Sequence, residues 1–259
     1  MKEVANYIKS IEIESLWNGK KHVKWNLNPG VNILSGVNGV GKSTILNRVI
    51  MHLLNIDKLD RQADGVKLEY DVEGAHCVDF DVIRSFDRPV LSGDIMKKVT
   101  DTQLQTELDF QVTLSNQMVE LFTKQDPQAQ EKAQQLAQEK AHFQDVVDSL
   151  FKDTGKTILR DKNELYFDSF GETLSPYKLS SGEKQMLIIL LSVLVQNKRH
   201  YTLFMDEPEV SLHVEWQQQL VSLIRDLNPN AQIILTTHSP AVIMNGWADC
   251  VTDVEDIVS

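Results

Sequence analysis

The feature that most constrains the fold is residues 31–50, in which a short apolar run is followed by GVNGVGKST and then by an apolar segment with helical spacing. The middle part fits the phosphate-binding pattern GxxxxGK[ST], with Gly36, Gly41, Lys42 and Ser43 at the required places. Glycines allow such a loop to wrap around a phosphate with its backbone N–H groups pointing inward, and the positive end of the following helix adds to the attraction. We then expect Lys42 on the β- and γ-phosphates and the hydroxyl of Ser43 on Mg²⁺. A glycine-rich turn that binds nothing is the alternative, and the strand before the loop and the helix after it disfavour it.

The size and charge of the chain limit the classes of protein to consider. Its 259 residues, 42% of them hydrophobic and 24% charged, suffice for one large α/β domain or for a domain that carries a smaller lobe. The formal net charge of −11 argues against a broad basic surface for nucleic acid, but it leaves room for a local one. Basic residues gather in two places, each of which we interpret as a solvated turn rather than a phosphate-contacting patch: Lys20, Lys21, His22 and Lys24, and Lys198, Arg199 and His200.

The sequence predicts a soluble, cytoplasmic protein without a membrane partner. Residues 1–10 lack the apolar core of a signal peptide, and no apolar run approaches the roughly 20 residues that a membrane helix needs. Cys77 and Cys250 have neither a metal-binding nor a redox spacing, so we interpret them as reduced thiols.

The chain ahead of the phosphate loop is expected to form two strands, residues 10–17 and 21–27, joined by a turn at Asn18-Gly19. Such an opening would lay side chains over a nucleotide base, and we place Trp17 on the adenine ring. An aromatic packed within the sheet is an equally good interpretation of Trp17.

After the loop, a helix and two strands are predicted over residues 43–54, 66–72 and 77–83. The second strand runs into residues 84–87, where a loop that senses the γ-phosphate could lie.

Between residues 96 and 152 the composition changes to Gln, Lys, Glu and Asp with spaced apolar residues and one break, at Asp126-Pro127. Two amphipathic helices folded back on each other fit this pattern. We interpret the polar surface as a solvated helix face, with a partner-binding surface as the alternative. The predicted division is therefore an inserted helical hairpin lobe over residues 96–157 and a core made of residues 1–95 and 158–259. A hairpin around Asp161-Lys162-Asn163, with strands over residues 157–159 and 164–167, is expected to follow the lobe.

Residues 177–195 open with LSSGEKQ and run into a strongly apolar helix. Ser180 and Ser181 are good helix N-caps, and Gly182 permits a close backbone approach, so this helix start also offers N–H donors to an anion. A capped core helix without a ligand remains the alternative.

Two further strands end in groups that suit phosphate chemistry. Residues 201–207, YTLFMDE, are an apolar strand that ends in two carboxylates. Asp206 can hold Mg²⁺, directly or through water, and Glu207 can accept a proton from an attacking water. After a helix predicted over residues 211–227, the strand over residues 232–236 leads to His238, whose neutral ring could donate to a γ-phosphate oxygen. A last short strand is expected at residues 250–254.

Together, GVNGVGKST, LSSGEKQ, YTLFMDEPEVSLH and ILTTHSP resemble the motifs of the ATP-binding cassette (ABC) ATPases, and the match spans nearly the whole chain. Within that superfamily, DEPEVSLH followed by TTHSP looks like the SMC-related branch of RecF-like and OLD-like ATPases. That branch includes stand-alone AAA family proteins of chromosome maintenance and phage defence. The resemblance implies an α/β P-loop fold, in which a mixed sheet with flanking helices is joined by a helical lobe that carries the signature motif.

The resemblance also implies a role for each motif. Glu207 becomes the catalytic base, His238 the switch histidine, and Lys42 a catalytic phosphate ligand. Ser43 and Asp206 become the residues that bind Mg²⁺. The residues implied for ATP binding are Gly36, Asn38, Gly39, Val40, Gly41, Lys42, Ser43, Thr44 and, at the base, Trp17. The signature, which contacts ATP bound to the opposite protomer, is Ser180, Ser181, Gly182 and Glu183, and the D-loop is Ser211, Leu212 and His213.

A dimer follows from the same resemblance. One chain has one phosphate loop, residues 36–44, which corresponds to the Walker A motif of the family, and one signature. The family joins these across an interface, so a complete site requires two chains. ATP would hold a head-to-tail homodimer together and hydrolysis would release it, driving DNA clamping or a separate effector protein.

The chain departs from the family pattern at three places. Ser181 stands where a second glycine is usual, and His213 takes the place of the D-loop aspartate, as in the OLD-like branch. No glutamine marks a Q-loop near residues 85–87.

The leading hypothesis is Mg²⁺-dependent ATP hydrolysis that gates a DNA-maintenance or phage-defence process. An ATPase subunit of a transporter is one alternative, disfavoured by the missing Q-loop and the helical insertion. A nucleotide-gated binding module with negligible turnover is another, and Glu207 argues against it. The sequence has no acidic cluster beyond the ATP site that would indicate a nuclease, so we assign any cutting of nucleic acid to a separate effector.

Overall fold

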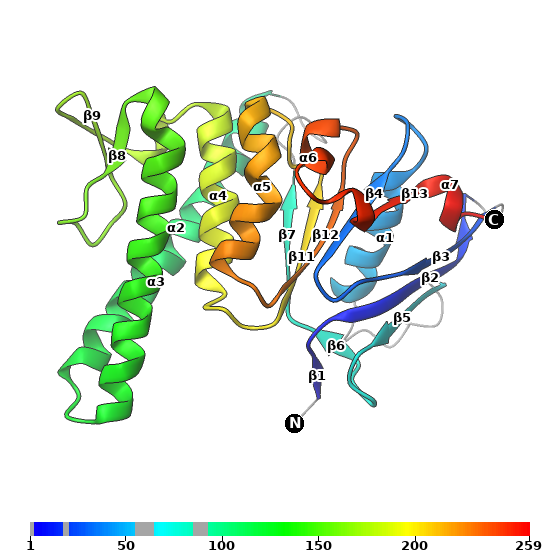
Figure 1. Cartoon of the computed structure of the whole chain (residues 1–259), viewed down its shortest axis with the longest axis horizontal. Coiled ribbons are helices and arrows are strands. Elements are labelled where there is room, and N and C mark those ends of the chain that lie inside the picture. Colours follow the sequence, from blue (N-terminus) through cyan, green and yellow to red (C-terminus); the bar gives the residue numbers. More distant parts are fainter. Residues whose placement is uncertain (1–2, 18–20, 55–64, 85–92) are drawn as a thin grey trace.

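The computed structural model describes residues 3–17, 21–54, 65–84 and 93–259, and it has the predicted α/β architecture (Figure 1). A five-stranded parallel sheet forms its centre, in the order β13-β4-β12-β11-β7. These strands are β4 (Val31–Ser35), β7 (Phe80–Arg84), β11 (Tyr201–Asp206), β12 (Ala231–Thr236) and β13 (Val251–Asp253). β12 is buried along its whole length, as a parallel strand covered on both faces must be. The register pairs Asp206 with Thr236, so the strands that carry the predicted chemistry end at one edge of the sheet.

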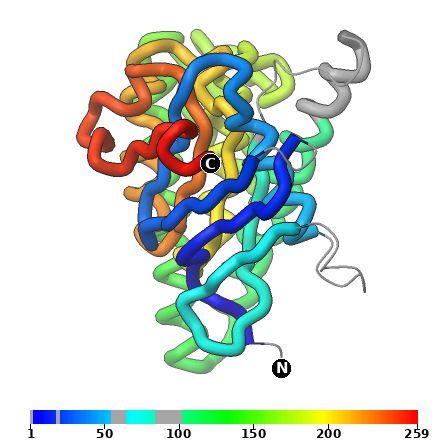
Figure 2. Tube along the Cα trace, turned by 90° about the vertical axis from the view of Figure 1, so that its right-hand side faces the viewer, coloured from blue at the N-terminus to red at the C-terminus, as the bar shows by residue number. Residues whose placement is uncertain are grey.

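A second, antiparallel sheet faces the viewer in Figure 2. It has the order β3-β2-β5, from β2 (Ile8–Leu16), β3 (Lys21–Asn26) and β5 (Val66–Tyr70). Helix α1 (Lys42–Leu54) packs between the two sheets, and its apolar face contributes Ile45, Leu46 and Val49 to a core that includes Ile11 and Phe204 from the two sheets. The parallel and antiparallel strands thus occupy separate sheets. A short pair, β1 (Val4–Ala5) and β6 (Cys77–Val78), lies beside them.

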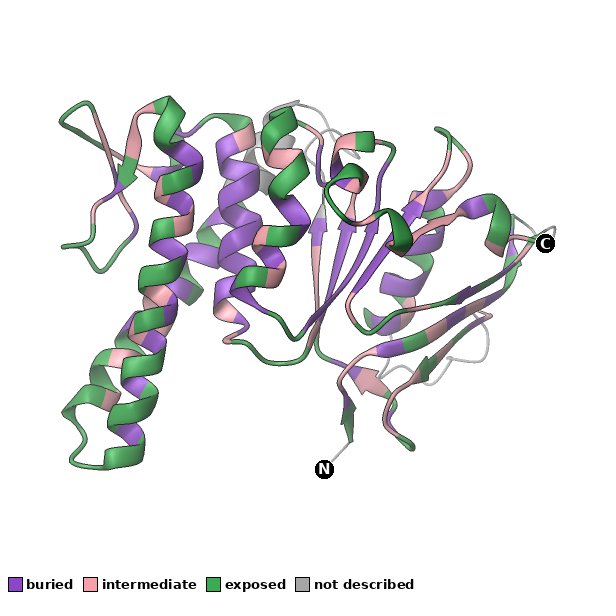
Figure 3. Cartoon of the chain, viewed as in Figure 1, coloured by how far each residue is buried: buried purple, intermediate pink, exposed green. Residues whose placement is uncertain are grey.

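The helices α4 (Ser181–Val195) and α5 (Val214–Leu227) lie on the other face of the parallel sheet, and α2 (Gly93–Thr123) and α3 (Pro127–Phe151) pack against them (Figure 1). α4 is buried on all sides from residue 183 to residue 194, which explains why its sequence is apolar without a polar stripe. α2 and α3 form the predicted helical hairpin, and Asp126 caps α3 with Pro127 in its first turn. The tip of the hairpin extends away from the sheet and is mostly exposed (Figure 3).

Smaller elements complete the chain. In the sequence, α3 is followed by a three-stranded antiparallel sheet and then by α4. The sheet consists of β8 (Lys156–Ile158), β9 (Phe167–Ser169) and β10 (Glu172–Leu174). Two short helices, α6 (Pro240–Met244) and α7 (Val254–Ile257), follow β12 and β13. Single 3₁₀ turns occupy Lys152–Thr154, Pro176–Lys178 and Ala248–Cys250.

Several predicted boundaries were wrong. The single strand expected over residues 77–83 is two, because β6 pairs with β1 and β7 pairs with β11 in another sheet. The helix expected from residue 211 begins at Val214, because Ser211 has a positive φ of 71°. The strand expected over residues 164–167 starts only at Phe167, and the residues before it form a loop. The expected turn at Asn18-Gly19 and sensor loop at residues 85–87 lie outside the described residues.

The helical hairpin does not form a separate core. α2 begins before residue 96, and buried residues of α2 and α3 share one cluster with α4, α5 and the parallel sheet, among them Leu104, Phe143 and Ile188. A division into lobe and core at residues 96–157 therefore stays a prediction. Within the described part of the chain, no helix is both long enough and apolar enough to span a membrane.

Candidate nucleotide-binding site

The phosphate loop connects β4 to α1 at the carboxyl edge of the parallel sheet (Figure 1). Gly39 and Gly41 have φ of 84° and 107°, which side chains with a Cβ rarely adopt, so the loop needs glycine there. Lys42 is only 4% exposed, and its Nζ donates hydrogen bonds to the carbonyl oxygens of Gly36 at 2.7 Å and Val37 at 3.2 Å. The loop thus surrounds the ammonium group of Lys42, and this positive charge favours the binding of an anion.

Ser43 and Asp206 are brought together from positions 163 residues apart. The hydroxyl of Ser43 donates to Oδ1 of Asp206 at 2.7 Å, and the hydroxyl of Thr236 donates to the same oxygen at 2.6 Å. A hydroxyl and a carboxylate at one point are hard oxygen donors, which Mg²⁺ prefers together with water and phosphate oxygens. The residues present therefore fit a bound Mg²⁺-nucleotide, and Ser43 and Asp206 are the candidate protein ligands of the metal.

Glu207 lies in a constrained backbone conformation. Its φ is 48°, in the left-handed region, and its backbone N–H is held by the carbonyl and the hydroxyl oxygens of Thr236, each at 3.1 Å. The side chain is 10% exposed, with Oε1 at 3.8 Å from Nδ1 of His238. The strained turn after β11 thus directs the second carboxylate to the histidine rather than along the strand.

His238 is positioned by a buried glutamate. Oε1 of Glu209 accepts hydrogen bonds from the hydroxyl of Thr237 and from the backbone N–H of His238, the latter at 3.3 Å, and it lies 3.9 Å from Nδ1 of His238. Burial raises the pKa of the Glu209 carboxyl, and the bond from Thr237 opposes that rise. The imidazole stays 46% exposed, so it faces the open side of the site.

These groups surround one cavity of about 220 Å³. It is lined by Asn38, Gly39, Gly41, Lys42, Ser43, Thr44, Glu207 and His238. Of the residues predicted to bind ATP and Mg²⁺, Gly36, Val40, Trp17 and Asp206 do not line it. Gly36 contributes its carbonyl to Lys42, Val40 packs against the core between the sheets, and Asp206 is connected to the lining by its hydrogen bond with Ser43.

Trp17 lies directly against the phosphate loop. A Cβ placed on Gly41 would come within 2.3 Å of Cζ2 of Trp17, so the indole covers the backbone of that glycine. Trp17 remains 42% exposed, unlike Trp25 in the neighbouring strand, which is 2% exposed. The ring is therefore not packed within the sheet, and stacking on adenine stays a prediction.

The predicted signature forms the start of α4. Ser180 and Glu183 make a capping box, in which each side chain binds the backbone N–H of the other. The Glu183 carboxylate is 3% exposed and also accepts from Lys156 at 2.9 Å and Thr154 at 2.8 Å. Burial pushes the pKa of Glu183 upward, but these hydrogen bonds outweigh it and the pKa lies below its usual value. The side chain of Glu183 thus faces its own chain, whereas Ser180 and Ser181 are exposed.

Gly182 and the predicted D-loop are in contact. A Cβ on Gly182 would lie 2.5 Å from the carbonyl oxygen of Ser211, so this helix start admits only glycine without a shift. Ser211 and His213 are exposed, whereas Leu212 is buried. The signature and the D-loop therefore form one surface at the same edge of the molecule as the phosphate loop, with α5 and α6 between them in Figure 1.

Sequence reasoning missed three residues that hold the site together. Thr236 bonds both acidic residues after β11, and Glu209 holds His238. Gln217 on α5 accepts from Ser239 at 2.7 Å and donates to the carbonyl of Leu212 at 2.9 Å, so it links the histidine loop to the D-loop. Two features of the sequence could have indicated these residues. Thr236 is a polar residue at the end of an apolar strand, and Glu209 is the third acidic residue in the run DEPE.

Comparison with known proteins agrees with this geometry. A family profile described as "AAA domain, putative AbiEii toxin, Type IV TA system" matches residues 87–245, a stretch that holds α4, β11 and His238 but begins after the phosphate loop. The Septu protein PtuA of Bacillus thuringiensis is 25% identical over 306 residues, covering 91% of this chain and 72% of that protein. The Retron Vc95 probable ATPase of Vibrio cholerae serotype O1 biovar El Tor is 32% identical over 84 residues, which cover 28% of this chain and 16% of that protein.

Among solved structures, an SmcHead bound to the C-winged helix domain of ScpA superposes with a TM-score of 0.57 at 12% identity, over 92% of this chain and 91% of that one. At this identity the likeness shows a shared fold, that of the SMC head.

Proposed function

The chain belongs to the AAA domain family matched above, and on that premise we propose that it binds and hydrolyses ATP with Mg²⁺ and forms a head-to-tail dimer when ATP is bound. The fold and the family are those of an ATPase-type domain. To this fold and family the proposal adds ATP turnover, dimerisation on binding ATP, and a partner for the dimer.

One observation carries the proposal: the 2.7 Å hydrogen bond between Asp206 and Ser43, a residue that lines the same cavity as Glu207 and His238. The loop N–H groups and Lys42 would bind the phosphates, and Ser43 and Asp206 would hold Mg²⁺, which when bound neutralises charge on the phosphate oxygens. Glu207 would accept the proton of the attacking water, and His238 would donate a hydrogen bond to a γ-phosphate oxygen.

The second chain is supported by what this cavity lacks. Among the described residues, none of the signature residues Ser180, Ser181 and Gly182 lines it. They lie on the same edge of the molecule, at the positive end of α4, where Ser180 and Ser181 are exposed and Gly182 is half-buried; this suits a phosphate supplied by another copy. A two-fold arrangement would bring each signature to the phosphate loop of its twin and complete both sites at once.

The process that the dimer drives is the broadest part of the proposal. We assign it to DNA maintenance or phage defence in the cytoplasm, with DNA or a separate effector protein as the partner, and kinship with the Septu protein PtuA and a retron ATPase supports this direction. A transporter subunit is less well supported, because neither relative is named as one.

The test is the Glu207→Gln variant with ATP and Mg²⁺, followed by size-exclusion chromatography with light scattering. We expect a trapped dimer that Lys42→Ala cannot form. A persistent monomer at high protein concentration would contradict the dimer. Absence of phosphate release by the unaltered chain, with nucleotide bound, would favour a binding module without turnover.

A further inference from the structure

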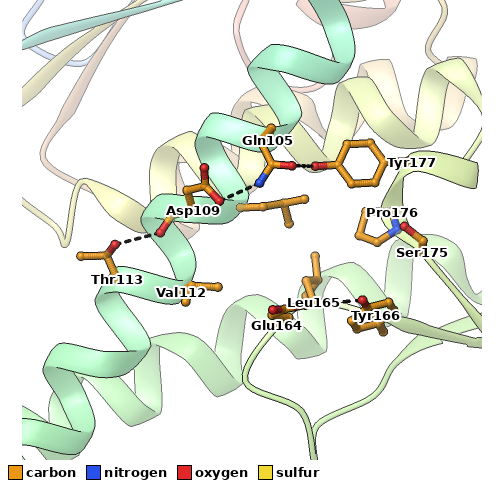
Figure 4. A pocket seen from close by; sticks show the side chains of 11 residues that line it. Gln105, Asp109, Val112, Thr113, Glu164, Leu165, Tyr166, Ser175, Pro176 and Tyr177 are labelled. Atoms are coloured by element: carbon orange, nitrogen blue, oxygen red, sulfur yellow. Dashed lines mark hydrogen bonds between the residues drawn. The ribbon is translucent and has the colours of Figure 1, made fainter.

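A second cavity, of about 420 Å³, lies beside α2 and away from the nucleotide site. Three segments far apart in the sequence enclose it (Figure 4): α2 itself, the loop before β9, and the turn Pro176–Lys178 that leads into α4. It is larger than the 220 Å³ cavity at the phosphate loop, and nothing in the proposed ATP chemistry uses it.

The floor of this cavity is apolar. Leu108 is 9% exposed and Leu165 is 6% exposed, and Pro176 is also buried. Val112 continues the apolar surface along α2. Such a floor accepts a hydrocarbon stem but offers nothing to a polar group.

The rim is acidic. Asp109 on α2 and Glu164 on the loop before β9 both line the cavity and both are exposed. Oδ1 of Asp109 accepts from Gln105 at 2.6 Å, and Oε2 of Glu164 accepts from the hydroxyl of Tyr166 at 3.4 Å. Within the described residues each carboxylate keeps a second oxygen without a hydrogen bond, and no Lys, Arg or His is among the lining residues. The lining of the cavity therefore contributes two negative charges and no positive one, and the structure shows one cation next to that lining, Lys162 beside the ring of Tyr166.

Two tyrosines add aromatic rings. Tyr166 and Tyr177 line the cavity, and the ring of Tyr166 already attracts a cation of its own chain, since Nζ of Lys162 lies 4.6 Å from its centroid. An apolar floor, ring faces and two carboxylates together match one kind of side chain, a long stem that ends in a cation. Arginine fits best, because its planar guanidinium both stacks on rings and pairs with carboxylates.

We propose that this cavity is a docking site for an arginine side chain on a segment of a partner protein, and that the effector of the proposed function engages the ATPase here. The inference rests on that function, in which an effector exists. DNA is not the occupant, because its phosphates would meet Asp109 and Glu164.

The position of the site explains how docking would relate to ATP. Gln105 on α2 bonds both Asp109 and the hydroxyl of Tyr177, and Tyr177 stands three residues before Ser180 in the signature. A cation that draws Asp109 toward itself acts on a hydrogen-bonded chain that ends at Tyr177, in the turn that leads into α4. Docking would therefore act on the segment just before the proposed dimer surface.

The probe is the peptide acetyl-Ala-Arg-Ala-amide, compared with the same peptide carrying citrulline, which keeps the shape of arginine and removes its charge. Titration into the isotopically labelled full chain is followed by the NMR signals of residues 105–113 and 164–177. We expect shifts confined to these residues and binding of the arginine peptide about tenfold tighter than that of the citrulline peptide. Equal binding of the two, or no shift in these residues at the solubility limit, overturns the proposal.

The double variant Asp109→Asn/Glu164→Gln keeps the volume of both side chains and should abolish the preference for arginine. Glu131→Gln is the matched control, since Glu131 is an exposed acid elsewhere on the hairpin. A preference that survives in the double variant contradicts the site. Adding Glu207→Gln to the double variant separates the two proposals: dimerisation with ATP should persist, whereas its loss in every variant would count against the ATP-gated dimer and not against the docking site.

Discussion

The carbonyl oxygen of Ser211 lies where a Cβ on Gly182 would come within 2.5 Å of it. Gly182 lies in the first turn of the signature helix and Ser211 belongs to the loop after β11, so the predicted signature and the predicted D-loop already touch within one chain. Because a Cβ on Gly182 would meet a backbone atom of Ser211, a change of side-chain rotamer could not relieve the clash. A movement of the loop after Glu207 would therefore move the start of α4.

Gly182→Ala should separate nucleotide binding from dimerisation. The added methyl forces the D-loop away at a cost of about 1 to 3 kcal/mol, which predicts a loss of about tenfold or more in ATPase activity. Affinity of the monomer for ATP, measured by calorimetry, should stay unchanged because the phosphate loop is not touched. Gly30→Ala is the control, since its Cβ would lie 4.0 Å from Arg225. Equal activity of both variants would show that the contact does not matter.

Thr236→Val should lower turnover more than stability explains. The variant keeps the shape of the side chain but removes the hydroxyl that bonds Asp206 and the N–H of Glu207, at a cost of about 1 to 3 kcal/mol in unfolding free energy. Thr202→Val is matched to it, because Thr202 is equally buried and bonds Gln232 at 3.3 Å at the far end of the sheet. Denaturant unfolding and phosphate release should show two destabilised proteins, of which only Thr236→Val has lost activity.

Trp17→Ala should weaken ATP binding about tenfold if the indole stacks on the base, whereas Trp17→Phe should retain most of the affinity. Triphosphate alone lacks a base, and its binding, measured by competition, should respond far less to the substitution. Equal losses for ATP and triphosphate would instead mean that Trp17 only supports the backbone of Gly41.

Glu107 should make stability depend on pH. Burial, with the nearby charge of Asp81, raises its pKa to about 7, while Ser192 opposes the rise. The folded protein holds this proton more tightly than the unfolded chain does, so the protonated carboxyl adds to the free energy of unfolding. This contribution is largest below the unfolded pKa of about 4.5 and is lost as pH rises through about 7, a decrease of up to about 3 kcal/mol.

Urea unfolding across this pH range is the measurement. Glu107→Gln should remove this part of the slope, because the amide keeps the volume and cannot ionise. Glu131→Gln, at an exposed position, should leave the slope as it is. An unchanged slope in Glu107→Gln would show that Glu107 does not hold the proton.

Helices and strands with strong local patterns were predictable. The sequence predicts the hairpin of α2 and α3 from the spacing of its apolar residues and from the capping residue Asp126 at the break. Each of these signals can be recognised within a few consecutive residues. The division of residues 77–83 between two sheets was not predictable, because the partner strands β1 and β11 lie far away in the sequence. Local propensity reports that a segment is extended, but not which strand it pairs with.

By itself the sequence determined the phosphate loop, the two acids at the end of β11, the position of His238 after β12 and the capped start of α4, because each is a short run of residues with a strong local pattern. Only the tertiary structure decided that Thr236 holds Asp206 and Glu207 in place, that Glu209 holds His238, and that Glu183 turns inward to Lys156. The acidic cavity beside α2 belongs to the same class, since its walls come from three separate segments. Such contacts depend on strand register and helix packing, which sum many weak interactions over the whole chain, and no local pattern of residues encodes them.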